Sequence, residues 1–181
     1  MTKIDLKEEI EIPEGVDIKI EDGALTAKGP KGKASRIFRG PKIKLEVKNN
    51  KIAISSIKST KREKRLIGTF KSHIKNIMQG VTESHTYKLK ICSTHFPMNA
   101  SVKDGVFEVS NFLGEKVPRI IKLRPGVDVK IDSQEITVES TNKELAGQTA
   151  ASIEGLCRTT NRDRRIFQDG IYIISKSEKE R

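Results

Sequence analysis

The sequence predicts an α+β fold of two tandem, similar domains from an internal duplication, each an antiparallel sheet with a helix packed on one face. Two observations support this fold class. The chain contains two copies of one pattern of alternating apolar residues, and a helix-like spacing of apolar residues follows each copy. A length of 181 residues suits two small domains, and a hydrophobic fraction of 35% allows each a modest core.

The clearest repeat joins residues 41–56 to residues 125–140 at a constant offset. The apolar residues that alternate in register are Ile43, Leu45, Val47, Ile52 and Ile54 in the first copy and Val127, Val129, Ile131, Ile136 and Val138 in the second. Alternation places one face of a strand pair on a core. Each copy is therefore predicted to be a β-hairpin, with polar turns at 48–50 and 132–134.

A second pair of matching segments precedes the hairpins, at residues 13–32 and 97–114. Each contains an Asp-Gly pair, Asp22-Gly23 or Asp104-Gly105, which favours a tight hairpin turn. The loops Gly29-Pro30-Lys31-Gly32-Lys33 and Asn111-Phe112-Leu113-Gly114 take equivalent places. Both are predicted to connect strands, and each is also compatible with lying against an RNA backbone.

A helix is predicted after each hairpin. Thr60 with Glu63, and Thr141 with Glu144, have the spacing of a capping box at a helix start. The apolar positions at helical spacing are Leu66, Phe70, Ile74 and Ile77 in the first helix and Leu145, Ile153 and Leu156 in the second. The first helix is predicted to end at Gly80 and the second at Asn161.

The domain boundary is predicted just after the alternating residues Tyr87, Leu89 and Ile91. The first domain would then span residues 1–92 and the second residues 93–174. Residues 175–181 are polar, so we expect them to form a mobile tail.

The charge of the chain indicates its class of partner. Thirty-five Lys and Arg against 24 Asp and Glu give a net charge of +11, which favours a polyanion such as a nucleic acid. The excess is uneven, because residues 1–92 hold 21 basic and 11 acidic residues and residues 93–181 hold 14 and 13. Net charge alone therefore places a nucleic-acid contact in the first half of the chain.

Several classes of protein are disfavoured. No apolar run approaches the roughly 18 residues that cross a bilayer, and the N-terminal residues lack the apolar stretch of a signal peptide. The two cysteines, Cys92 and Cys157, lie far apart in the sequence, so we expect a reducing, intracellular setting without a membrane partner.

The sequence offers no pattern for catalysis. The histidines His73, His85 and His95 stand apart from any nucleophile motif, and Cys92 with His95 lacks the second pair of ligands of a zinc site. We therefore expect no enzyme activity, no metal and no cofactor.

Two clusters of cations in the second half are the best candidates for phosphate contacts, because arginine forks suit phosphate. They are Lys116, Arg119, Lys122 and Arg124, and then Arg158, Arg162, Arg164 and Arg165. The second cluster follows a predicted helix and leads into Phe167 and Tyr172, which can stack on bases or pack in a core. The first-half clusters at 31–39 and 61–65 fit a secondary RNA contact or solubilising charge equally well.

Seven short motifs together are more specific than any one of them. They are Ile12-Pro13-Glu14-Gly15-Val16, Lys28-Gly29-Pro30-Lys31-Gly32, Gly80-Val81-Thr82, Thr94-His95-Phe96-Pro97-Met98, Asn111-Phe112-Leu113-Gly114-Glu115-Lys116, Arg124-Pro125-Gly126-Val127 and Asp169-Gly170-Ile171-Tyr172. In this order, from about Ile10 to Ile174, they resemble the family of large-subunit ribosomal protein six. The archaeal and eukaryotic branch fits best.

The resemblance implies a structural constituent of the large ribosomal subunit, located in the ribosome in the cytoplasm and without catalysis or a cofactor. It implies two similar α+β domains and binding to large-subunit rRNA near the sarcin-ricin loop. Its partners would be this rRNA and neighbouring large-subunit proteins, with translation factors close by. The second domain would be the main rRNA-binding domain, through Asn111, Gly114, Lys116, Arg124, Gly126, Asn161, Arg162, Arg164, Arg165 and Gly170.

Two other functions remain open at this point. A free-standing RNA-binding or RNA-remodelling module is compatible with the same composition, and stable association with assembled large subunits in high salt would separate it from a ribosomal protein. An enzyme acting on RNA would need an acid and a base in one cleft.

Overall fold

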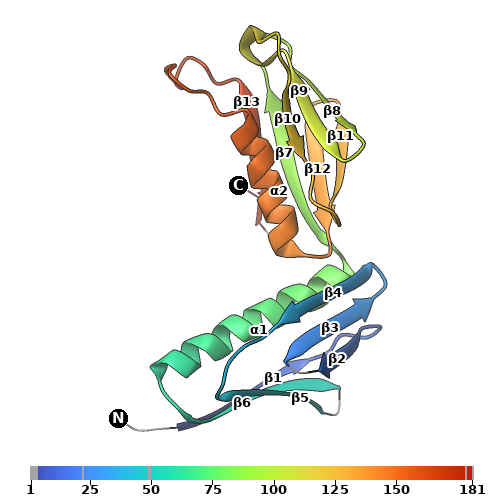
Figure 1. The fold of residues 1–181 in the computed structure, drawn as a ribbon, viewed down its shortest axis with the longest axis vertical. Coiled ribbons are helices and arrows are strands. Elements are labelled where there is room, and N and C mark those ends of the chain that lie inside the picture. Colours follow the sequence, from blue (N-terminus) through green and yellow to red (C-terminus); the bar gives the residue numbers. More distant parts are fainter. Residues whose placement is uncertain (1–3, 22, 49, 178, 181) are drawn as a thin grey trace. The chain divides into compact units, whose positions relative to one another are not determined.

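The chain folds into two compact units, residues 1–84 and 85–181, in the computed structural model, which describes residues 4–21, 23–48, 50–177 and 179–180 (Figure 1). Each unit combines antiparallel sheets with one long helix. This confirms the predicted α+β class and the predicted duplication.

The first domain contains helix α1 and two three-stranded antiparallel sheets of order β1-β6-β5 and β2-β3-β4. The elements are β1 (Ile4–Glu11), β2 (Asp17–Glu21), β3 (Ala24–Gly29), β4 (Gly32–Ile37), β5 (Ile43–Lys48), β6 (Lys51–Ser59) and α1 (Lys61–Thr82). Strands β5 and β6 form the hairpin that alternation predicted. The predicted turn residues Asp22 and Asn49 lie outside the described residues.

The second domain contains helix α2, a five-stranded sheet of order β11-β12-β7-β13-β14 and a three-stranded sheet of order β10-β9-β8. The elements are β7 (His85–Cys92), β8 (Asn99–Lys103), β9 (Val106–Ser110), the 3₁₀ helix η1 (Phe112–Gly114), β10 (Arg119–Lys122), β11 (Asp128–Asp132), β12 (Glu135–Ser140), α2 (Lys143–Leu156), β13 (Gly170–Lys176) and β14 (Lys179–Glu180). The predicted hairpin is the β11–β12 pair.

The domain boundary lies at Ser84, earlier than the predicted residue 92. Strand β7 was assigned to the first domain from its apolar alternation, but it pairs with β12 and β13 in the middle of the second sheet. It occupies the place that β1 takes beside β6 in the first domain. Apolar alternation identifies a strand but not the strand with which it pairs. Only the observed pairing could therefore assign β7 to the second domain.

The start of α1 follows the predicted capping box. The carboxylate of Glu63 accepts hydrogen bonds from the amide of Thr60, at 2.8 Å, and from its hydroxyl, while the Thr60 hydroxyl accepts from the amide of Arg62. The helix continues past Gly80 to Thr82. At its end the amides of Glu83 and Ser84 donate hydrogen bonds to the carbonyls of Gln79 and Gly80. Its buried apolar side chains include Ile67 and Met78, which were not among the predicted apolar positions.

Helix α2 differs from its prediction at both ends. Asn142, and not Thr141, is the N-cap, and its side chain accepts a hydrogen bond from the amide of Glu144 at 2.9 Å. The helix ends at Leu156 rather than Asn161. An N-cap side chain can accept a hydrogen bond from the amide two or three positions later. The spacing to Glu144 was therefore compatible with both Asn142 and Thr141.

Each domain has its own apolar core, and each helix contacts strands of both sheets in its domain. Fully buried side chains include Leu25, Ile52 and Ile54 in the first domain and Leu89, Phe107 and Ile136 in the second. Each such burial stabilises the fold by about 2 kcal/mol. Ser175 and Lys176 belong to β13, so the predicted mobile tail begins inside a strand, and residues 178 and 181 lie outside the described part.

Candidate nucleic-acid interface

Three segments of the second domain gather where α2 ends and β7 ends (Figure 1). They are residues 93–98, 111–118 and 157–169, and we call this part of the domain the loop end. The side-chain amide of Asn111 donates a hydrogen bond to the carbonyl of Pro97 at 2.9 Å, which joins the first two segments. Arg119, which directly follows the second segment, donates at 2.7 Å to the carbonyl of Leu156, which directly precedes the third.

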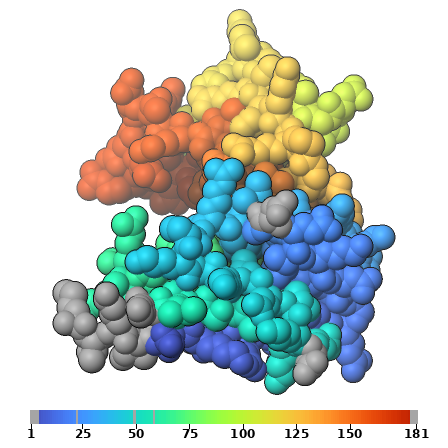
Figure 2. All heavy atoms as spheres, turned by 60° about the horizontal axis from the view of Figure 1, so that its bottom comes forward, coloured from blue at the N-terminus to red at the C-terminus, as the bar shows by residue number. Residues whose placement is uncertain are grey.

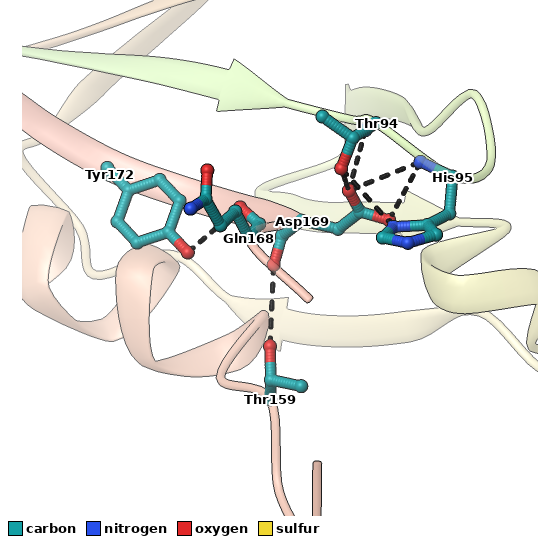
Figure 3. Close-up of polar contacts among 6 residues, drawn as sticks. All are labelled: Thr94, His95, Thr159, Gln168, Asp169 and Tyr172. Atoms are coloured by element: carbon teal, nitrogen blue, oxygen red, sulfur yellow. Dashed lines mark hydrogen bonds and ion pairs between the residues drawn. The ribbon is translucent and has the colours of Figure 1, made fainter. Parts of the chain in front are cut away.

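The strongest connection within the loop end is made by Asp169, whose side chain is completely buried (Figure 3). Its carboxylate accepts hydrogen bonds from the amide of Thr94 at 2.6 Å and from the Thr94 hydroxyl. It also accepts from the amide of His95 at 3.2 Å, and the His95 ring nitrogen Nδ1 lies 3.2 Å from it. The carbonyl of Asp169 accepts from the hydroxyl of Thr159 at 3.4 Å.

The environment of Asp169 keeps its carboxyl charged. Burial raises the pKa of this group, but the hydrogen bonds from Thr94 and His95 outweigh burial and bring the pKa below its ordinary value. A carboxylate only accepts hydrogen bonds, so the contact requires the His95 Nδ1 to be the donor. This leaves the Nε2 edge of the ring outside the Asp169 contact.

An aromatic stack continues from this hydrogen-bonded group towards the surface. The ring of His95 stacks on the ring of Phe167, with centroids 4.8 Å apart and an angle of 21° between the planes. The guanidinium of Arg162 lies over the same Phe167 ring at 4.8 Å from its centroid. A planar cation on an aromatic face gains about 0.5–1 kcal/mol at an exposed site. Asp169, His95 and Phe167 therefore connect the core to the exposed Arg162.

The segment 111–114 is shaped by left-handed backbone. Asn111, Leu113 and Gly114 have φ angles of +61°, +50° and +79°. The Gly114 backbone faces the ring of Phe96, from which a Cβ would be 3.6 Å away. Asn111 and Gly114 therefore give the loop its form. The equivalent loop of the first domain is a tight turn between β3 and β4, held by a hydrogen bond from the Lys31 amide to the Val81 carbonyl.

The first cluster of cations divides by role. Arg119 makes a two-pronged ion pair with Glu115, at 2.6 and 2.8 Å, and its guanidinium lies 4.3 Å from the centroid of the Phe112 ring. Together with its bond to Leu156, this engages Arg119 within the protein. Lys116, Lys122 and Arg124 are exposed, and none forms an ion pair with another residue in the described part of the chain.

The second cluster divides in the same way. Arg165 pairs with Asp163, with Nη2 2.7 Å from the carboxylate, although 90% of its side chain is exposed. Arg158, Arg162 and Arg164 are exposed, and among the residues that the structure describes none of them forms an ion pair. In the face shown in Figure 2, atoms of the segment that follows α2, coloured orange-red, lie at the molecular surface. This segment therefore presents cations to solvent.

A shallow groove of about 320 Å³ lies beside this segment. Arg158, Arg164 and Tyr172 line it. The hydroxyl of Tyr172 donates a hydrogen bond to the carbonyl of Gln168 at 3.0 Å, so the ring is held in place along the groove (Figure 3). Phe167 and Tyr172, both considered for base stacking, thus have contacts within the protein, and Tyr172 also borders open space.

Eight of the ten predicted site residues lie at or beside the loop end: Asn111, Gly114, Lys116, Asn161, Arg162, Arg164, Arg165 and Gly170. Arg124 and Gly126 do not. The carbonyl of Gly126 accepts a hydrogen bond from the Ser140 hydroxyl at 2.7 Å, just before α2 begins. The 14 residues of α2 span about 21 Å, so these two residues form a separate group at the other end of the helix.

Sequence reasoning missed the roles of Thr94, His95 and Asp169. These residues stand in two of the quoted motifs, but nothing in either motif indicates that one binds the other. Within the described ranges, no three side chains of His, Cys, Asp or Glu are placed to hold a metal ion. Burial raises the pKa of Cys157 to about 11, so that thiol is uncharged at neutral pH.

Neither helix in the described part of the chain has both the length and the apolar composition that a bilayer crossing requires.

Comparison with known proteins identifies the family. The family model for ribosomal protein L6 matches the chain twice, over residues 12–84 and 96–170, once in each domain. The chain is 46% identical over 168 residues to the large ribosomal subunit protein uL6 of Methanosarcina mazei, which covers 93% of this chain and 96% of the relative.

Two further relatives with the same name are those of Methanococcus vannielii, 41% identical over 174 residues, and Methanobrevibacter smithii, 42% identical over 171 residues. These matches cover 96% and 94% of this chain and 96% of each relative. They confirm the resemblance that the seven motifs indicated. With both repeats matched and nearly the whole chain aligned, this chain belongs to the ribosomal protein L6 family.

Proposed function

We propose that this chain binds large-subunit rRNA mainly through its second domain, near the sarcin-ricin loop and the region where translation factors dock. The general role of the chain in the ribosome follows from its family. The chain is a structural, non-enzymatic constituent of the large ribosomal subunit, with rRNA and neighbouring ribosomal proteins as partners, and it acts in the cytoplasm within the ribosome.

The observation that carries the proposal is the exposure of Lys116, Arg162 and Arg164 on loops that are fixed from inside the domain. No acidic side chain in the described part of the chain pairs with any of the three. The hydrogen bonds of Asp169 with Thr94 and His95 connect these loops within the protein, in the absence of RNA. Loops whose backbone is already held lose less conformational entropy on binding, so more of each phosphate contact appears as affinity.

The second group, Arg124 and Gly126, supports a contact at two points. It lies about 21 Å along α2 from the loop end. Contacts at both positions would join two RNA helices, or two parts of one, to a rigid body. In this proposal the protein holds RNA segments together through phosphate and sugar contacts, and specificity comes from RNA shape rather than from base edges.

Binding of the purified chain to an rRNA fragment that contains the sarcin-ricin loop and its neighbouring helices tests this proposal. The loop-end variant carries Lys116→Gln, Arg162→Gln and Arg164→Gln. A matched control carries Lys88→Gln, Lys103→Gln and Lys130→Gln, three exposed lysines of the sheets whose loss changes net charge equally. Each phosphate contact contributes roughly 0.7–0.9 to the slope of log affinity against log salt concentration.

The loop-end variant should reduce this slope by about two and weaken binding far more than the control. Equal effects of the two variants would remove the loop end as the binding surface. Equal binding to an unrelated structured RNA of the same length would argue against the sarcin-ricin region. Dissociation of the chain from assembled large subunits in high salt would favour the free-standing RNA-binding module.

A further inference from the structure

The first domain has a cavity of about 350 Å³ that the proposed function does not use. It lies where the segment between β4 and β5 meets the first turns of α1. In Figure 2 this segment, coloured sky blue, reaches the molecular surface. Its lining includes Arg39, Gly40, Lys42, Ile43, Arg62 and Leu66, and we call it the basic cavity.

Three of the four charged side chains that line the basic cavity are cations. Arg39, Lys42 and Arg62 are exposed, and within the described ranges none forms an ion pair. The one acidic side chain of the lining, Glu63, is occupied by its hydrogen bonds with Thr60. These bonds lower the pKa of Glu63 to about 2, so it offsets one of the three positive charges. The cavity keeps a positive excess.

The backbone amides of Thr60 and Arg62, at the start of α1, already have acceptors within the protein. The amide of Thr60 donates to Glu63, and the amide of Arg62 donates to the Thr60 hydroxyl at 3.3 Å. An anion in the basic cavity would therefore be held by the long side chains that line it. Lys61, Lys64 and Arg65 are exposed nearby on the same helix and add to the positive potential.

The floor of the basic cavity is apolar. Gly40 packs directly against it, because a Cβ at Gly40 would lie 3.2 Å from a methyl carbon of Leu66 and 3.4 Å from Ile43. A cationic rim over an apolar floor fits a nucleotide, whose phosphate is anionic and whose ribose and base have apolar surfaces. An inorganic anion would use the rim alone.

We propose that the basic cavity is a second RNA-binding site, which takes one backbone phosphate among Arg39, Lys42 and Arg62 and lays the adjoining ribose over Leu66 and Ile43. The inference rests on the proposed function only in taking RNA as the partner. It accounts for the uneven charge. Residues 1–84 hold 19 basic and 11 acidic residues, against 16 and 13 in residues 85–181, although the loop end lies in the second domain.

The test uses the full chain and the same rRNA fragment. The cavity variant carries Arg39→Gln, Lys42→Gln and Arg62→Gln, which keep most of the side-chain length. Its matched control carries Lys19→Gln, Lys28→Gln and Lys75→Gln, three exposed lysines of the first domain outside the cavity. The cavity variant should bind about tenfold more weakly than its control and lose about one unit of salt slope. Equal thermal unfolding midpoints would establish that both are folded.

Ultraviolet crosslinking of the wild-type complex, followed by mass spectrometry, gives an independent readout. RNA crosslinks are expected on the peptide that contains Gly40 and Ile43. Crosslinks confined to the second domain, or equal affinity of the cavity variant and its control, would overturn the proposal.

The loop-end variant separates the two proposals. Loss of affinity in the cavity variant alone would leave this site standing and remove the loop end. Loss in the loop-end variant alone would do the reverse.

Discussion

The buried carboxylate of Asp169 accepts hydrogen bonds from both the amide and the hydroxyl of Thr94, a residue 75 positions earlier in the chain. The bonds fasten the end of the segment after α2 to the end of β7 (Figure 3). Asp169 also contacts the ring of His95, which stacks on Phe167, and the Phe167 ring in turn carries the guanidinium of Arg162 on its face. The geometry of the exposed cations thus depends on a residue that solvent does not reach.

Asp169→Asn should lower both stability and RNA affinity. An amide cannot accept as many hydrogen bonds as a carboxylate, and its NH₂ group would face the donors of Thr94 and His95, so unfolding free energy should fall by about 2 kcal/mol. Urea unfolding and rRNA binding would be measured beside Asp128→Asn, an exposed control. Unchanged affinity in a destabilised Asp169→Asn protein would show that the loops keep their form without this carboxylate.

The contribution of Asp169 should disappear in acid. Its folded pKa lies below the ordinary value of 3.8, so the charged form favours folding above that pH, and this contribution is lost as the pH falls through the folded pKa. The difference in unfolding midpoint between wild type and Asp169→Asn should therefore shrink as the pH falls through the folded pKa of Asp169. A difference independent of pH down to acid unfolding would contradict the assignment.

Phe167 and Arg162 should act as one unit in RNA binding. Phe167→Leu removes the ring under the guanidinium, so Arg162→Gln should cost less in the Phe167→Leu background, with a coupling of about 0.5–1 kcal/mol. A double-mutant cycle of rRNA affinities measures this. A parallel cycle of Arg162→Gln with Ile166→Ala, an exposed neighbour, should be additive. Additivity in both cycles would show that the stack does not position Arg162.

Arg119 and Lys116 should affect different quantities although only two residues separate them in the sequence. Arg119→Gln breaks the contacts with Glu115 and Leu156, so it should reduce unfolding free energy by about 2 kcal/mol and leave the salt slope unchanged. Lys116→Gln should leave stability unchanged and reduce the slope by about 0.7–0.9. Thermal unfolding and binding at several salt concentrations decide between these assignments. A reduced slope for Arg119→Gln would make it an RNA contact.

Gly170→Ala should destabilise the second domain by about 1–3 kcal/mol. The φ angle of Gly170 is +157°, and a Cβ there would lie 3.3 Å from both the Cys157 carbonyl and the Tyr172 hydroxyl. Gly155→Ala is the control, because a Cβ at this helical position meets nothing within 4 Å and should stabilise by about 0.5–1 kcal/mol. Equal unfolding midpoints for the two variants would count against a backbone requirement at Gly170.

The sequence by itself determined the features whose signals are local. Alternation in Ile43, Leu45 and Val47 requires one buried face, and the spacing of Thr60 and Glu63 defines a helix start, so the β5–β6 hairpin and the capping box of α1 were predictable. The constant offset between the two hairpins predicted the duplication for the same reason.

Tertiary structure decided the features that depend on contacts between distant segments. It placed β7 in the second domain, engaged Arg119 within the protein and moved Arg124 and Gly126 to the far end of α2 from Lys116. It also buried Asp169 under Thr94. A residue's own neighbours in sequence fix its local conformation, but packing of whole elements chooses its partner. The cations that remain exposed are therefore known only once the chain has folded.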